Sequence, residues 1–168
     1  MGNHGTTTFY GDELVTNGTF DTDTGWTKGT GWTIDVSNSN KAECDGSQSS
    51  HTALTPSSDI TPVVGRSYYF SFQILDYSAG DFWIQVGGSS FNPANEDGTY
   101  TTTIVATTTG RFEFKGNDFF VGSVDNISIK EVGVAAGWTT ADAEPLIPQT
   151  ALMGMSKPMV FDGIDNRV

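Results

Sequence analysis

The sequence predicts an all-β protein, an antiparallel β-sandwich of the jelly-roll type with extended arms at both ends. One observation is a long alternating stretch at residues 63–75, which predicts a strand with one buried face and a neighbour on each edge. The residues on its apolar side are Tyr68, Phe70, Phe72 and Ile74. Further short alternating segments recur at near-regular intervals between turn residues, which is typical of a sandwich. No run of ten or more residues has apolar positions at helical spacing.

The N-terminal part begins with a polar leader, residues 1–12, in which only Phe9 and Tyr10 could pack. We expect this leader to be an arm. Residues 13–21 then predict two short strands joined by a turn at Asn17-Gly18, a dipeptide typical of hairpins.

Three short strands are expected before the long one, at residues 31–36, 41–44 and 51–54. In the first of them Trp32, Ile34 and Val36 share a face, so Trp32 is expected in the core. Cys44 alternates with Ala42 and is expected to be a buried thiol.

Four strands are expected after the long one, at residues 81–86, 100–106, 111–115 and 124–132. Their predicted inward side chains are Phe82, Ile84, Val86, Phe112, Phe114, Ile127 and Ile129. Trp83 and Gln85 fall on the opposite side from Phe82.

The formal net charge of −12 argues against nucleic-acid partners, because an acidic surface repels phosphate and no Lys/Arg cluster offsets it. Anionic membrane surfaces are disfavoured for the same reason, and no apolar stretch is long enough to span a bilayer.

Four motifs in order carry a resemblance to a known family. They are residues 14–21 followed by two Gly-Trp pairs, residues 64–72, residues 98–101 and residues 124–129. Over about residues 13–132 this series resembles the carbohydrate-binding-module-type jelly rolls of the galactose-binding-like superfamily. Such modules occur in glycosidases, adhesins and phage structural proteins alike, so the resemblance implies the fold more strongly than the ligand.

A structural calcium ion is implied by the same resemblance. Family members often hold one between their first and last strands, and the matching positions here are Asp21 and Asp125, with the backbone carbonyl of Gly18. Asp21 stands where the family usually has Glu. The alternative is a turn-capping Asp and a surface Asp. An EF-hand is excluded, because the twelfth position from Asp21 is Trp32.

Sugar binding in such modules uses the outward side of one sheet, where an aromatic ring stacks on a pyranose and amides or carboxylates bond its hydroxyls. The outward residues that could do so are Tyr69, Gln73, Trp83, Gln85 and Glu113. The competing interpretation, which we place slightly ahead, is that an arm or a neighbouring subunit covers this face.

Catalysis is not expected. The two histidines, His4 and His51, stand alone in polar loops, and no nucleophile elbow or phosphate loop occurs. None of the 20 acidic residues has an apolar sequence context that would raise its pKa.

Residues 133–168 differ in composition and contain half of the prolines and three of the four methionines. We interpret this segment as an extended assembly arm, with an extra strand of the same domain as an equal alternative. Its candidate contact residues are Leu152, Met153, Met155, Met159 and Phe161.

The preferred function is a non-enzymatic structural protein of a phage particle, on the capsid or associated with tail or fibre. The composition is typical of extracellular proteins, yet the N-terminus has no signal-peptide pattern, and a virion reconciles the two. Its expected partners are other virion proteins and further copies of itself. The alternative is a free carbohydrate-binding module or adhesin that recognises host or environmental glycans.

Overall fold

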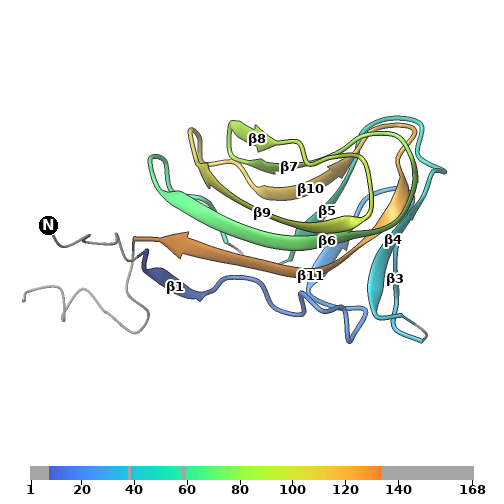
Figure 1. Ribbon diagram of the computed structural model, residues 1–168, viewed down its shortest axis with the longest axis horizontal. Coiled ribbons are helices and arrows are strands. Elements are labelled where there is room, and N and C mark those ends of the chain that lie inside the picture. Colours follow the sequence, from blue (N-terminus) through green and yellow to red (C-terminus); the bar gives the residue numbers. More distant parts are fainter. Residues whose placement is uncertain (1–7, 38, 58–59, 134–168) are drawn as a thin grey trace, which may run out of the picture. The chain divides into compact units, whose positions relative to one another are not determined.

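A computed structural model describes residues 8–37, 39–57 and 60–133. These residues form eleven strands in two antiparallel sheets, which confirms the predicted all-β sandwich (Figure 1). Among them there is no helix that could cross a bilayer. Most of the predicted leader and the whole predicted assembly arm beyond Gly133 lie outside the described residues.

The first sheet, called sheet A, has the order β3-β4-β11-β6-β9, and β1 pairs with β11 beside this path. Its strands are β1 (Tyr10–Glu13), β3 (Trp32–Asp35), β4 (Lys41–Asp45), β6 (Ser67–Ala79), β9 (Gly98–Val105) and β11 (Val121–Val132). The long strand predicted from the alternation is β6, and it has a hydrogen-bonded neighbour on each edge, as expected.

The second sheet, called sheet B, has the order β2-β5-β10-β7-β8. Its strands are β2 (Trp26–Lys28), β5 (Thr52–Pro56), β7 (Phe82–Val86), β8 (Ser89–Phe91) and β10 (Phe112–Gly116). The long strands of sheet A curve, and sheet B lies on the inside of that curve (Figure 1).

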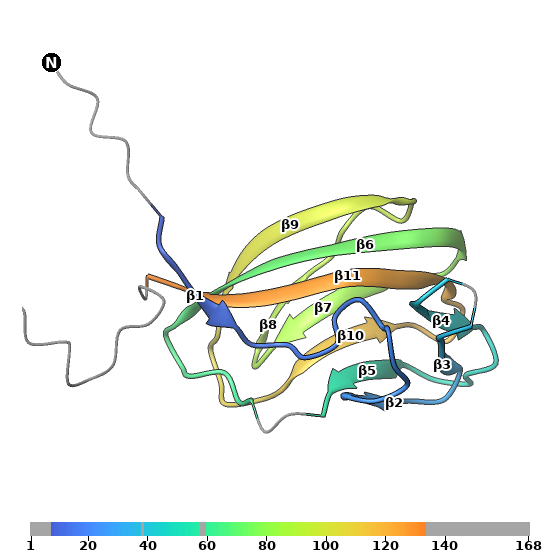
Figure 2. The same ribbon diagram turned by 90° about the horizontal axis from the view of Figure 1, so that it is seen from below.

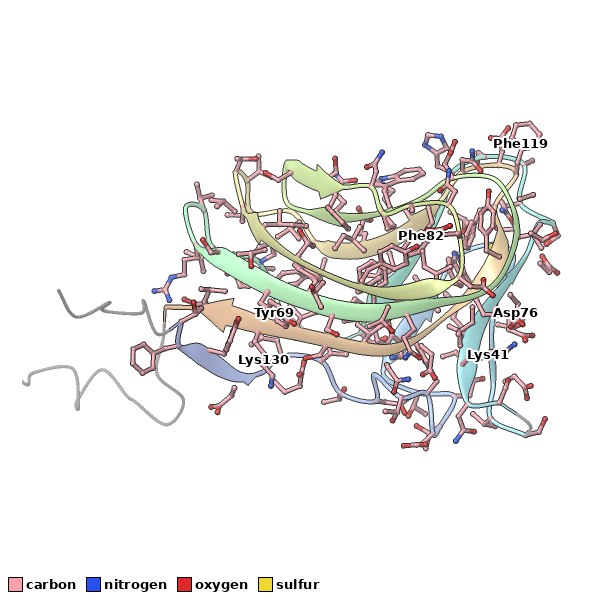
Figure 3. The ribbon with its side chains drawn as sticks, in the orientation of Figure 1. Lys41, Tyr69, Asp76, Phe82, Phe119 and Lys130 are labelled. Carbon is pink, nitrogen blue, oxygen red and sulfur yellow. The ribbon has the colours of Figure 1, made fainter. Side chains whose placement is uncertain are left out.

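Aromatic rings from both sheets fill the core. Phe114 on β10 is fully buried, and its ring contacts Phe70 and Phe72 on β6 and Trp26 on β2. Phe82 also lies between the sheets (Figure 3). Each such side chain contributes about 1.5–3 kcal/mol through removal of apolar surface from water. The predicted burial of Trp32, Cys44 and the inward-facing residues is confirmed.

The Asn17-Gly18 segment does not form the predicted hairpin, because no strand follows it before β2. It packs instead against β11, where the Gly18 carbonyl accepts a hydrogen bond of 2.9 Å from the Ile127 amide. A Cβ on Gly18 would lie 1.9 Å from the Ile127 carbonyl oxygen, so only glycine fits here. The Asn17-Gly18 dipeptide therefore indicates a close approach of the Gly18 backbone to that of Ile127, and not a two-residue turn.

Candidate functional site

The outward face of sheet B carries a compact group of polar and aromatic side chains. Glu113 on β10 pairs with Gln85 on β7, and Lys115 pairs with Trp83 one step further along the same two strands. The neighbouring residues Phe112, Phe114, Phe82, Ile84 and Val86 are buried. Strict alternation therefore leaves these four side chains on the opposite, outward side.

Lys115 connects the polar members of this group. Its ammonium donates to Gln85 Oε1 at 3.2 Å and to Glu113 Oε2 at 3.3 Å. The side chains of Lys115 and Glu113 are about a quarter exposed, so the ion pair stays in contact with solvent. These contacts bring an amide, a carboxylate and an ammonium together on one surface, where each can bond a hydroxyl.

An aromatic pair lies beside the polar group. His51 directly precedes β5, and its ring meets the indole of Trp83 on β7 at 5.1 Å between centroids with an interplanar angle of 77°. Since β10 lies between β5 and β7, the two rings meet across that strand. The edge-on contact favours this orientation of the half-buried indole.

The group extends into a shallow hollow of about 260 Å³ on the β2–β5 side. Lys28, Thr30, Ser49, Ser50 and His51 are among its lining residues. Because His51 belongs both to this hollow and to the ring pair, the aromatic surface and the hydroxyl-lined hollow are continuous. We call the surface formed by His51, Trp83, Gln85, Glu113 and Lys115 the sheet B platform.

The two other predicted sugar-binding residues lie on the opposite side of the molecule. Tyr69 and Gln73 are on β6, and they face outward from sheet A. The ring of Tyr69 contacts that of Tyr10 on β1 at 4.9 Å between centroids. Figure 3 shows Tyr69 and Lys130 close together on this side. Gln73 accepts a hydrogen bond from the Asn126 side chain and donates one to Thr99.

The structure therefore does not bring the five predicted residues together. It groups Trp83, Gln85 and Glu113 and adds two residues that the sequence did not single out, His51 and Lys115. The spacing of Lys115 two positions after Glu113 was a usable signal, since it places both side chains on one face. His51 carried no such signal, because it lies in a loop.

The carboxyls of the predicted calcium residues Asp21 and Asp125 already accept hydrogen bonds within the protein. Asp125 is desolvated by burial, which raises the pKa of its carboxyl, a result that its sequence context did not predict, and the nearby charge of Asp21 adds to this. The Asn126 amide donates to Asp125, and Asn40 and Thr19 donate to Asp21. The Gly18 carbonyl is already engaged by Ile127.

Calcium prefers six to eight oxygen ligands. Among the described residues no cluster of three or more His, Cys, Asp or Glu side chains could hold a metal ion. The two neighbouring carboxylates of Asp21 and Asp125 are surrounded by hydrogen-bond donors, and they provide fewer oxygen ligands than a calcium ion needs. The calcium site stays a prediction, and the function proposed below does not depend on it.

One further charged cluster lies at the β4 end of the sandwich. Lys41 donates to Asp76 at 2.5 Å and to Glu43 at 2.9 Å, and these two hydrogen bonds raise the pKa of the Lys41 ammonium (Figure 3). Each charge has a partner of opposite sign here, so the cluster is explained as a structural ion pair.

Comparisons with known proteins find similarity at the level of solved structures only. No family model matches the chain, and no curated protein matches it. Similar solved structures are carbohydrate-binding modules. The module "BiXyn10A CBM1" in its apo form is 16% identical, with 76% of this chain and 99% of that chain covered and a TM-score of 0.46.

A mutant of the module CBM29-2, from a study of ligand recognition by family 29 carbohydrate-binding modules, is 15% identical. The match covers 79% of this chain and 97% of that one, with a TM-score of 0.44. A second family 29 mutant is 11% identical over 79% and 98% of the two chains, with a TM-score of 0.42. At these sequence identities and TM-scores, the similarity assigns neither a function nor a site to this chain.

Proposed function

We propose that this protein binds glycans through the sheet B platform. The main observation behind the proposal is that a half-buried indole lies beside an amide, a carboxylate and an ammonium on one outward sheet face. A pyranose has an apolar face that suits an aromatic ring and a rim of hydroxyls that suits such polar groups. Binding sites of this kind combine apolar contact area with a few placed hydrogen-bonding groups.

The platform suits neutral glycans better than anionic ones. Its one ammonium is already paired with Glu113, and the whole chain carries a net charge of −12. Sulfated, sialylated or uronic-acid chains would therefore meet a repulsive field.

The resemblance of the sequence motifs to carbohydrate-binding-module-type jelly rolls supports the same function. The alternative interpretation reached from the sequence, a glycan-binding module or adhesin, is thus the one that the geometry favours. Display on a phage particle, a virion location and the absence of catalysis stay predictions, and none of them is needed for glycan binding.

A glycan array tests the proposal with three proteins, the wild type, Trp83→Ala and Tyr69→Ala. Wild type should bind a set of neutral oligosaccharides. Trp83→Ala should lose at least tenfold in affinity, equivalent to about 1.4 kcal/mol. Tyr69→Ala removes an aromatic ring from the opposite face and should bind like wild type. Absence of binding across a broad array, or loss in Tyr69→Ala alone, would refute the proposal.

A further inference from the structure

The sandwich has one edge strand that differs from the others. Sheet edges in soluble proteins are usually protected by shortness, charge, proline or a bulge, because a bare edge pairs with other strands. The edge strands β1, β2, β3 and β8 have four residues or fewer, and the first three each carry a charged residue. β9, by contrast, spans eight residues, Gly98–Val105, as Figure 2 shows at the rim of sheet A.

β9 lacks the protection that a strand's own sequence and register can give, although β8 of sheet B comes close to it. Its sequence, Gly-Thr-Tyr-Thr-Thr-Thr-Ile-Val, contains no charge and no proline. Its register with β6 runs without a shift from Ser67↔Val105 to Ile74↔Gly98, so no bulge turns the edge away. The nearest charged residues in the sequence, Asp97 and Arg111, lie outside the strand.

The backbone groups on the free edge can be assigned from the ladder. Ala106 donates its amide to the Arg66 carbonyl, which places Ala106 among the residues bonded toward β6. Along an antiparallel strand, residues whose amide and carbonyl bond to one neighbour alternate with residues whose amide and carbonyl point to the other side. The amides and carbonyls of Thr99, Thr101, Thr103 and Val105 therefore point away from β6, to the open edge. The side chains of these same four residues are exposed.

We infer that β9 is a homodimerisation edge that pairs antiparallel with β9 of a second copy. The proposed register places Thr101 opposite Thr103 of the second copy and Thr99 opposite its Val105. In this register, residues whose backbone groups point to the open edge lie opposite each other on the two strands. This register forms about eight backbone hydrogen bonds between the two copies, and the outward side chains of both strands stay on the outward face of sheet A. Thr–Thr pairs across strands are favourable, and no like charges meet.

A second copy fits this edge better than a foreign strand. The interface is isologous, so one self-complementary strand is sufficient, and closed two-fold pairs are the commonest assemblies. Two chains of net charge −12 repel each other, and the β9 strand itself carries no charge that would add to this repulsion. The inference rests on the edge geometry and does not depend on the proposed glycan binding.

The two-fold axis of such a dimer runs perpendicular to sheet A, so the outward faces of both sheet B copies point the same way. If the proposed function holds, the dimer presents two platforms to one surface, which raises avidity.

The test measures the mass of the full-length chain by sedimentation and light scattering over a concentration series. Wild type should form a dimer, and added salt should strengthen it by screening the charge. Thr103→Pro removes an amide that points to the open edge and leaves the ladder to β6 intact. Thr103→Lys adds a charge at the same position without changing the backbone. Each should weaken the dimer at least tenfold.

The matched control is Ser71→Lys, which adds the same charge on the same face of β6, opposite Thr101 and away from the edge. It should leave the dimer intact. Hydrogen exchange should protect the amides of Thr99, Thr101 and Thr103 only in the dimer. A wild-type chain that stays monomeric at every concentration would overturn the inference. So would a dimer that both Thr103 variants leave unchanged, since Thr103→Lys retains the backbone even if the proline variant fails to fold.

Discussion

The ring of Tyr10 on β1 packs against the ring of Tyr69 on β6, with 4.9 Å between centroids. This contact covers a sugar-binding candidate of sheet A with the chain's own N-terminal strand. Among the described aromatic rings, that of Trp83 on sheet B contacts the exposed ring of His51. The aromatic contacts of the described residues thus differ between the two faces of the sandwich, and the proposed glycan-binding platform lies on the sheet B face.

The Tyr10 contact should contribute to stability and not to binding. Tyr10→Ala should lower the free energy of unfolding by about 1 kcal/mol, because it removes an aromatic pair. Phe9→Ala is the matched control, since the Phe9 side chain is 58% exposed. Denaturant unfolding measures both changes. Equal effects of the two substitutions would mean that the ring contact contributes nothing specific.

Lys115 should position the polar part of the platform. Lys115→Met keeps the length of the side chain but removes the ammonium that bonds Gln85 and Glu113. Glycan affinity should fall about three- to tenfold while thermal stability changes little, because a partly exposed ion pair is worth only about 0–1 kcal/mol. Titration calorimetry with an oligosaccharide identified on the array gives the affinity. Unchanged affinity would remove Lys115 from the site.

Phe114 should be among the most sensitive core positions. It is fully buried among Trp26, Phe70 and Phe72, and Phe114→Ala should cost about 3–5 kcal/mol. Phe119→Ala is the control, because Phe119 is 67% exposed at the rim (Figure 3) and should change stability by less than about 0.5 kcal/mol. Thermal and denaturant unfolding compare the two. A mild effect at Phe114 would contradict the aromatic packing described above.

Asp125 gives the stability of the protein a dependence on pH. Burial, with a smaller addition from Asp21, raises its pKa above the ordinary 3.8. A carboxyl whose pKa is higher in the folded state favours folding below pH 3.8 and loses this contribution as pH rises through the folded pKa. Without calcium, Asp125→Asn should therefore be more stable than wild type at pH 7, and the difference should vanish in acid.

The same pair of proteins tests the predicted calcium site. If calcium binds at Asp21 and Asp125, it should raise the melting temperature of wild type and leave Asp125→Asn unaffected. If calcium changes neither protein, the two aspartates are a turn cap and a surface residue, the alternative reached from the sequence.

Alternation along single strands was enough to predict which residues are buried. Tyr68, Phe70, Phe72 and Ile74 on β6 are all buried, as are Phe112 and Phe114 on β10. This succeeded because the pleat fixes the two faces of a strand by its geometry alone. Val36 failed the same rule, since β3 ends at Asp35 and leaves its side chain 45% exposed.

Alternation could not predict which outward residues lie on the same side of the molecule. Tyr69 and Trp83 are both outward, but β6 belongs to sheet A and β7 to sheet B, so they lie on opposite sides of the molecule. Sheet membership depends on long-range pairing, and alternation within one strand carries no information about it. For the same reason the contact of His51 with Trp83, which crosses β10, was not foreseeable.

The most direct test of glycan binding by the sheet B platform is the indole N–H resonance of Trp83 in ¹⁵N-labelled protein. It is assigned by its loss in Trp83→Phe and followed while a neutral oligosaccharide from the array is added. If glycans bind at the platform, this resonance and that of the side-chain amide of Gln85 should shift saturably, while the side-chain amide resonance of Gln73 on the far face should not shift. Shifts confined to Gln73 and its neighbours, with Trp83 unmoved, would contradict glycan binding at the platform.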